Sequence, residues 1–181
     1  MRKRSITAID MPRESTACFT GHRPEKLPWG YNEADMRCFV LKAELSKMIL
    51  QAYGCGYTHF IAGGALGADM YAAEAVLTLR EQYPEITLEI AIPHDGQTAK
   101  WPQSLRDRAE RIREEADVIT WIAHEYTKRC LFDRNYYMVS HCSVLLACFD
   151  GQAGGTAQTI ETAHRLGRLV TVVRPVRRKV A

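Results

Sequence analysis

The segment Gly63-Gly64-Ala65-Leu66-Gly67-Ala68-Asp69 decides the fold that this sequence predicts. It follows the apolar, strand-like run 59–62 and precedes the helix-like run 70–79. Three glycines in five positions allow a tight turn, and the N–H groups at the start of the next helix carry the positive end of its dipole. The segment therefore predicts a strand-to-helix corner whose backbone binds a phosphate or a carboxylate.

A second segment, Gly151-Gln152-Ala153-Gly154-Gly155-Thr156, has the same context. It follows the apolar run 144–149 and precedes another helix-like run. Two glycine-rich corners in matching positions predict that both contribute backbone N–H groups to one anion-binding site.

The rest of the chain alternates in the same way. The patterns predict strands over 16–20, 58–62, 87–92, 118–122, 143–149 and 169–173, and helices over 33–53, 68–83, 102–115, 129–139 and 156–166. In the first helix, one helical stripe carries Met36, Phe39, Val40, Ala43 and Leu50. Strands that are apolar nearly throughout and alternate with helices predict a single Rossmann-like, doubly wound α/β domain, with a mostly parallel sheet flanked by helices on both faces.

The loops that follow the strands are expected to carry the function. Right-handed crossovers place every strand-to-helix loop at the same edge of a parallel sheet. The loops 20–32, 63–69, 93–101, 123–128 and 150–156 are therefore expected to converge on one crevice. The pattern does not fix the order of the strands, so it leaves open which loops adjoin.

Composition bounds the class of protein. With 181 residues, 46% hydrophobic and 25% charged, the chain fits one globular domain over 15–175, with basic, solvated tails at 1–14 and 176–181. No apolar run approaches the roughly 20 residues of a membrane span. Six cysteines without Cys-x-x-Cys spacing, and no secretory-type segment before them, predict a cytoplasmic location.

Several well-known catalytic signatures are absent. The sequence has no P-loop motif, and its first strand-to-helix turn reads Thr20-Gly21-His22-Arg23-Pro24 in place of the dinucleotide fingerprint. The six histidines lack metal-binding spacing, so no metal site is predicted, and no Gly-x-Ser-x-Gly elbow is present. Arg23 is placed to grip a phosphate, whereas His22 is more typical of a local hydrogen-bonding residue than of a catalyst.

Other polar residues each have a structural and a functional interpretation. Asp69 either favours the positive end of its helix or accepts hydrogen bonds from ribose hydroxyls, and Thr156 either caps its helix or also binds a phosphate. Trp101 either stacks on a base or covers the sheet edge, while Gln97 offers a donor and an acceptor to a base or sugar. Arg134 and Asn135 lie on a predicted helix and either face the crevice or form a solvated surface.

Several ordered motifs carry a family resemblance. They are Gly21-His22-Arg23-Pro24, the 63–69 segment with Ala72-Ala73-Glu74, Pro93 with Gln97 and Trp101, Arg134-Asn135 with Met138-Val139, and Asp150-Gly151 with Gly154-Gly155-Thr156. From about residue 18 to 175 the chain resembles the YpsA-type proteins of the SLOG superfamily. That superfamily is similar to the LOG enzymes and to the Rossmann domain of DprA, and the resemblance implies a nucleotide or an ADP-ribose-like ligand.

The corners, the polar loops and the resemblance together select a set of ligand-binding candidates. They are Gly21, His22, Arg23, Gly63, Gly64, Gly67, Asp69, Gln97, Trp101, Arg134, Asn135, Gly154, Gly155 and Thr156. No certain cofactor is implied beyond such a ligand.

The sequence also departs from the related enzymes. LOG-type phosphoribohydrolases carry Pro-Gly-Gly-x-Gly-Thr-x-x-Glu, whereas this chain has Ala153 at the proline position and Thr159 at the glutamate position. Glu161 comes two residues later, on a different side of the helix. Ser140 and Ser143 stand where the YpsA-type pattern tends to have aspartates.

Three functions are compatible with these features. The first is a binding module that senses or regulates through a nucleotide-derived ligand, and it is expected to form a homodimer by analogy with other Rossmann-like proteins. The second is an N-glycosidic hydrolase of a nucleotide, for which Asp69 and Glu161 are the candidate catalytic acids. The third, nucleic-acid binding by analogy with DprA, is the least expected because the net charge is only +3 and basic and aromatic residues do not interleave.

Overall fold

The computed structural model describes residues 11–177 and contains a six-stranded sheet. Every neighbouring pair of strands is parallel, and the order across the sheet is β4-β3-β2-β1-β5-β6. The strands are β1 (Thr16–Gly21), β2 (His59–Ala62), β3 (Thr87–Ile92), β4 (Val118–Trp121), β5 (Val144–Cys148) and β6 (Leu169–Val173). The predicted basic tails fall largely on 1–10 and 178–181, outside the described residues.

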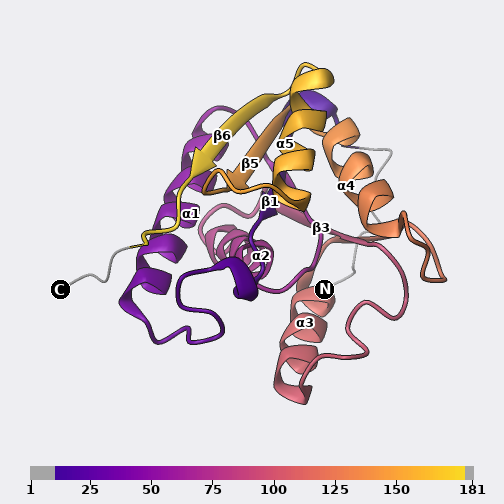
Figure 1. The fold of residues 1–181 in the computed structure, drawn as a ribbon. Coiled ribbons are helices and arrows are strands. Elements are labelled where there is room, and N and C mark those ends of the chain that lie inside the picture. Colours follow the sequence, from indigo (N-terminus) through magenta and orange to yellow (C-terminus); the bar gives the residue numbers. More distant parts are fainter. Residues whose placement is uncertain (1–10, 178–181) are drawn as a thin grey trace.

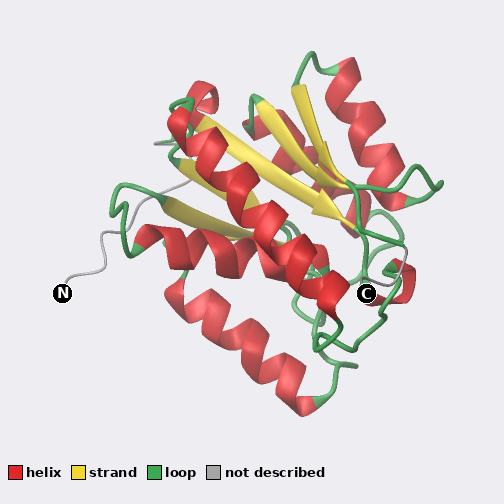
Figure 2. Cartoon of the chain, turned by 90° about the vertical axis from the view of Figure 1, so that its left-hand side faces the viewer, coloured by secondary structure: helices red, strands yellow, loops and turns green. Residues whose placement is uncertain are grey.

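Five α-helices cover the described part of the sheet from both sides (Figures 1 and 2). The helices are α1 (Met36–Gly54), α2 (Ala68–Arg80), α3 (Gln103–Glu115), α4 (Cys130–His141) and α5 (Gly155–Arg165), and two short 3₁₀ turns are η2 (Arg13–Ser15) and η3 (Pro24–Lys26). Helices α1, α2 and α3 pack on one face, while α4 and α5 pack on the other. The predicted Rossmann-like, doubly wound α/β domain is confirmed.

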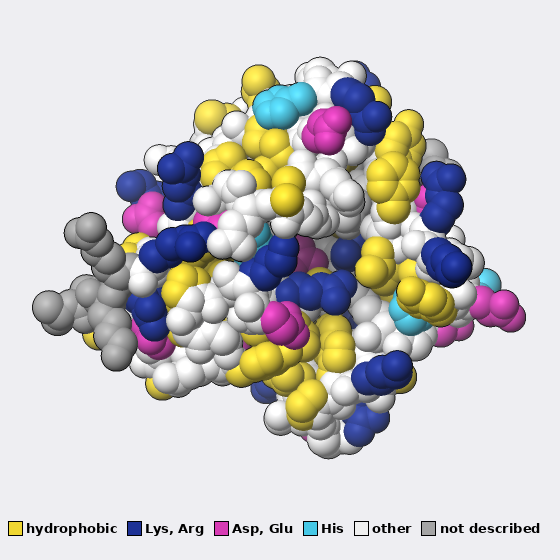
Figure 3. Space-filling view, viewed as in Figure 1, with side chains coloured by type: hydrophobic (Ala, Val, Ile, Leu, Met, Phe, Trp, Pro, Cys, Tyr) yellow, Lys and Arg dark blue, Asp and Glu magenta, His cyan; other side chains and the backbone are white. Residues whose placement is uncertain are grey.

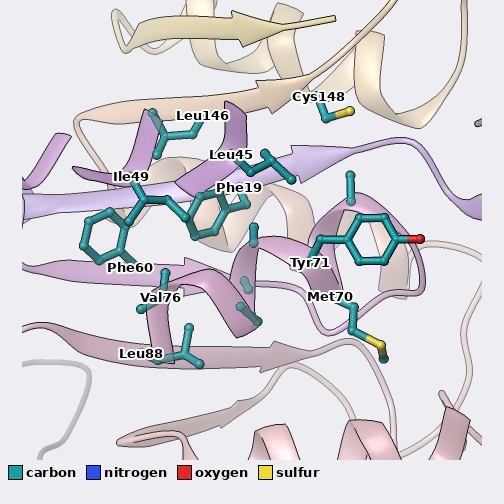
Figure 4. Packing of buried hydrophobic residues seen from close by; sticks show 14 of the residues in the cluster. Phe19, Leu45, Ile49, Phe60, Met70, Tyr71, Val76, Leu88, Leu146 and Cys148 are labelled. Carbon is teal, nitrogen blue, oxygen red and sulfur yellow. The ribbon is translucent and has the colours of Figure 1, made fainter. Parts of the chain in front are cut away.

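The core has two parts because successive side chains of a strand point to opposite faces of the sheet. On β1, Phe19 packs into the larger cluster with α1 and α2, whereas Cys18 packs into the smaller cluster under α4 and α5. Figure 4 shows Phe19 and Phe60 between the side chains of Leu45, Ile49 and Leu88. Burying a side chain such as Phe19 contributes about 1.5–3 kcal/mol to the free energy of folding, so packing on both faces of the sheet stabilises the fold.

Helix α1 forms where the sequence predicts it, but it buries a different stripe. It begins after Asp35, whose side chain accepts a hydrogen bond from the Arg37 N–H group, as an N-cap does. Its buried side chains include Leu41, Leu45 and Ile49. The apolar residues Met36, Phe39, Ala43 and Leu50 are exposed instead. Two apolar stripes at helical spacing run along α1, and the one richer in leucine and isoleucine packs on the sheet.

The order in which strands are added to the sheet reverses at β1, and this switch point positions the site. From β1 the chain adds β2, β3 and β4 on one side, and then returns to place β5 and β6 on the other. At the carboxyl ends of the two adjacent strands, Gly21 of β1 lies beside Cys148 of β5. Ligands of open α/β sheets bind in the crevice at such a switch point.

Candidate functional site

A pocket of about 370 Å³ lies at this switch point. It is lined by β1 (Phe19, Thr20, Gly21), the loop after β1 (His22, Arg23, Glu25, Lys26), the corner and first turn of α2 (Ala65, Asp69), helix α4 (Leu131, Arg134, Asn135, Met138) and the start of α5 (Gly155, Thr156). Near the middle of the face drawn in Figure 3, Lys and Arg side chains gather around a hollow. Three cations, Arg23, Lys26 and Arg134, and two carboxylates, Glu25 and Asp69, line the pocket, so the balance of charge is positive and favours an anion.

The loops after β1 and β5 are joined by His22. Its Nε2 atom lies 2.7 Å from Asp150 Oδ1, and both side chains are buried. Burial by itself raises the pKa of the Asp150 carboxyl, but hydrogen bonds from the Gln152 N–H group, His22 and Arg177 outweigh it and lower the pKa to about 2. His22 therefore acts as the local hydrogen-bonding residue that its position favours, and it fixes one rim of the pocket.

The Gly63–Asp69 corner forms a tight turn whose N–H groups bind the protein itself. Gly64 and Gly67 have φ angles of 62° and 87°, which lie in the left-handed region that favours glycine. The N–H group of Ala65 donates to Asp69 Oδ2 at 3.0 Å, and the N–H group of Ala68 donates to the His22 carbonyl at 3.1 Å. These two N–H groups are occupied, so this corner shapes the pocket wall with its backbone.

Asp69 is buried, and its carboxylate holds the turn of its own corner. Burial raises the pKa of Asp69, and the charge of Arg134 with the N–H groups of Ala65 and Gly63 counteracts part of that shift. Asp69 lies in the first turn of α2, as its predicted structural role requires, and it also holds the turn before that helix. Its place in the pocket lining also keeps it within the candidate site.

Arg134 reaches this corner from helix α4. Its Nη1 atom donates to the Gly63 carbonyl and lies 3.8 Å from Asp69 Oδ2. The side chain is buried, its Nε atom has no hydrogen-bond partner in the described structure, and burial lowers the pKa of its guanidinium. A Cβ atom on residue 63 would fall 1.5 Å from Nη1, which explains why glycine occupies that position. The buried guanidinium adds a positive charge to the pocket wall, which favours an anionic partner.

The second glycine corner leads directly into the pocket. Helix α5 starts after Gly154, which has a φ angle of 147° and supplies no side-chain cap. The first N–H groups of a helix have no partner within the helix and carry the positive end of its dipole. Gly155 and Thr156 of this first turn line the pocket. Lys26 donates from Nζ to the Ala153 carbonyl at 2.9 Å, which adds a positive charge beside the turn.

Asn135 connects α4 to α5 at the pocket. Its Nδ2 atom donates to Thr159 Oγ1 at 3.0 Å, and Thr159 donates in turn to the Gly155 carbonyl at 2.8 Å. Thr159, which stands at the glutamate position of the LOG pattern, is therefore a buried structural contact.

Seven predicted candidates lie outside the pocket lining: Gly63, Gly64, Gly67, Gln97, Trp101, Gly154 and Glu161. Gln97 donates to the Gly63 carbonyl at 3.0 Å and so stabilises the first glycine-rich corner. Trp101 is half-buried and packs on the larger core cluster, as in the structural interpretation of this residue. Glu161 is exposed on α5. Gly154 adjoins the lining as the residue before α5.

Sequence reasoning missed several lining residues, of which Lys26 is the most significant. Lys26 could have been found from its position, because it is a cation in the loop 20–32, which is expected at the crevice. Leu131 carried no signal, because apolar residues on a helix predict core packing, and Met138 carried only that of the family motif in which it stands.

These features define a Rossmann-like α/β domain with a cation-lined pocket at its topological switch point. The family model YpsA, described as "YspA SLOG family", matches residues 17–166. The chain belongs to this family.

Individual relatives agree with that assignment. A UPF0398 protein of Staphylococcus haemolyticus is 28% identical over 143 residues, which cover 78% of this chain and 76% of the relative. The UPF0398 protein YpsA of Bacillus subtilis is 23% identical over 139 residues, covering 76% of this chain and 77% of that protein.

A solved structure shares the fold. DNA processing protein A from Helicobacter pylori, described as binding single-stranded DNA, matches with a TM-score of 0.62 at 15% sequence identity. The match covers 91% of this chain and 66% of that protein. Within residues 11–177, no helix is long and apolar enough to cross a membrane.

Proposed function

We propose that the pocket at the β1–β5 switch point binds a nucleotide or a nucleotide-derived ligand through its phosphate, and that the protein acts in the cytoplasm as a sensor or regulator. The observation that carries this proposal is the convergence of Arg23, Lys26 and the buried Arg134 guanidinium on one pocket together with the uncapped start of α5. Positively charged side chains and free N–H groups at a helix start that line one pocket attract an anion.

The surroundings of Arg134 fit a phosphate. Arg23 and Lys26 line the pocket from the loop after β1, and the uncapped start of α5 supplies backbone N–H groups at Gly155 and Thr156. The volume of about 370 Å³ lies near the lower end of the roughly 300–1,000 Å³ of small-molecule sites, which favours a mononucleotide-sized group.

The contacts of the carboxylates favour binding over hydrolysis. Hydrolysis of an N-glycosidic bond needs acids that are free to act on substrate and water. Asp69 accepts the Ala65 N–H group, Glu25 accepts the Tyr31 hydroxyl at 2.6 Å, and Glu161 lies outside the pocket. The hydrolase therefore stays the alternative, and release of free base from a nucleoside monophosphate would support it.

Calorimetry with AMP, ADP-ribose and NAD tests the proposal. We expect saturable binding of at least one of them by the wild-type protein. Arg23→Gln should weaken that binding by about 10- to 100-fold, because a hydrogen bond to a charged group contributes roughly 1.5–3 kcal/mol. Arg111→Gln, an exposed change on α3 outside the pocket lining, is the matched control. No saturable binding at millimolar concentrations, or equal losses in both variants, would overturn the proposal.

A second candidate function is binding of single-stranded nucleic acid. The observation that favours it is the shared fold with DNA processing protein A, together with the three cations around the pocket. Fluorescence anisotropy with a labelled oligothymidylate would support it if the affinity fell steeply with salt and with Arg23→Gln. The homodimer stays a prediction, which sedimentation velocity measures directly.

A further inference from the structure

A second hollow of about 250 Å³ lies between helices α4 and α5, beside the pocket. The two share Leu131, Asn135 and Gly155 in their linings, so they are neighbours with a common wall. A Cβ atom on Gly155 would have nothing within 4 Å. The passage between the hollows therefore runs over backbone that no side chain covers.

Helix α4 presents large apolar side chains to this hollow. Leu131, Phe132 and Tyr136 line it and are 38%, 42% and 47% exposed. The rings of Phe132 and Tyr136 are nearly parallel, with centroids 6.4 Å apart and an angle of 21° between their planes. Exposed aromatic rings beside a polar pocket are suited to stacking on a flat aromatic group.

The rest of the hollow is lined by polar residues, which lie on α5 and at the start of α4. Gln158 lines the hollow from an exposed position, and its side-chain amide has both donors and an acceptor. Lys128 lies at the same hollow, and the guanidinium of Arg129 lies 5.5 Å from the centroid of the Phe132 ring. An apolar platform with an amide opposite and cations at the rim matches the chemistry of a nucleobase.

We infer that the α4–α5 hollow is the base subsite of the ligand whose phosphate lies in the pocket. This inference rests on the proposed function and adds which part of the ligand goes where. The phosphate lies at the start of α5 with Arg23 and Arg134, the sugar crosses Gly155, and the base stacks on the Phe132 and Tyr136 side chains. The occupant is thus a nucleotide, not a sugar phosphate.

The test compares AMP with ribose 5-phosphate, which lacks the base. Wild-type protein should bind AMP about tenfold or more tightly than ribose 5-phosphate, from the usual contribution of base stacking. The double variant Phe132→Ser/Tyr136→Ser should remove this difference and leave the affinity for ribose 5-phosphate unchanged. Gly155→Val, which places a side chain in the passage, should weaken AMP binding as well. Phe39→Ser, a change of an exposed aromatic residue on α1, is the control and should change neither affinity.

The outcomes separate this inference from the proposed function. If both probes bind and depend on Arg23, but the double variant keeps the preference for AMP, the base subsite is wrong and the phosphate site stands. If neither probe binds but ADP-ribose or NAD does, the inference fails and the proposed function stands. If none of these four compounds binds, both fail. If the double variant leaves AMP binding intact but changes the sedimentation coefficient, the α4 surface is an interface between copies, and the inference is overturned.

Discussion

Arg134 Nη1 and Asp69 Oδ2 lie 3.8 Å apart in the pocket wall, although their helices cover opposite faces of the sheet. The pair meets beyond the carboxyl end of β2, where Arg134 also binds the Gly63 carbonyl. Both side chains are buried, so the attraction between them is weakly screened by solvent. This contact ties the α4 layer to the α2 layer at the point where the pocket opens.

Replacing Asp69 by asparagine should destabilise the fold. The change leaves the buried Arg134 guanidinium without its carboxylate and weakens the hydrogen bond that the Asp69 side chain accepts from the Ala65 N–H group. We therefore expect a loss of about 1–3 kcal/mol in the free energy of unfolding. Urea denaturation measures it. Glu161→Gln, an exposed change on α5, should stay within about 0.5 kcal/mol of wild type, and equal effects of the two variants would contradict the prediction.

Replacing Gly63 by alanine should act through Arg134. The new methyl group would lie 1.5 Å from Nη1, so the guanidinium must leave its place in the pocket wall. We expect Gly63→Ala to weaken AMP binding about as much as Arg134→Met does. In a double-mutant cycle, the effects of Gly63→Ala and Arg134→Met should be far from additive, because both remove the same contact. Additive losses of affinity would show that residue 63 acts independently of Arg134.

Gly67→Ala should destabilise more than Gly151→Ala. Both glycines have φ angles in the left-handed region, 87° and 95°. At residue 67 a Cβ atom would also meet the His22 carbonyl oxygen at 2.6 Å, whereas at residue 151 it would meet nothing within 4 Å. Backbone strain alone is about 1–2 kcal/mol, and the clash at residue 67 adds to it. Thermal unfolding of the two variants gives the comparison, and equal midpoints would refute the clash.

Acid should weaken the joint between the β1 and β5 loops. The folded pKa of Asp150 is about 2, below its ordinary value of 3.8, so its contribution to stability is present above pH 3.8 and is lost as the pH falls towards 2. Asp150→Asn lacks this titration. The stability difference between wild type and Asp150→Asn should therefore shrink between pH 5 and pH 2, as measured by urea denaturation at a series of pH values. A difference that stays constant over this range would contradict the prediction.

The helices and strands of this fold were predictable because the signal for each is local. Apolar runs and glycine stops mark β1, β2 and the start of α2 within a few residues. Strand order is not local, since it depends on which distant strands pack together. The loop with Gln97 and Trp101 was expected in the crevice, but β2 separates β3 from β1, and this loop lies outside the pocket lining.

The site was predictable in part for the same reason. Arg23, Asn135 and Thr156 carry motif signals and line the pocket. The role of Arg134 in holding the Gly63 carbonyl is set by a contact between residues 71 positions apart, which no local pattern records. Glu89 is a similar case: it lies in an apolar strand pattern, yet it is buried with hydrogen bonds from Thr120 and Tyr137.

The reversal of strand order at β1 divides the pocket between two distant stretches of sequence. Residues 19–69 supply one wall and residues 131–156 supply the other, with the His22–Asp150 contact between them. A cut in the loop 123–128 would yield two fragments, and neither would hold a complete binding site. Any molecule that fills the pocket must therefore favour the reunion of such fragments, and fragment complementation becomes a direct reporter of occupancy.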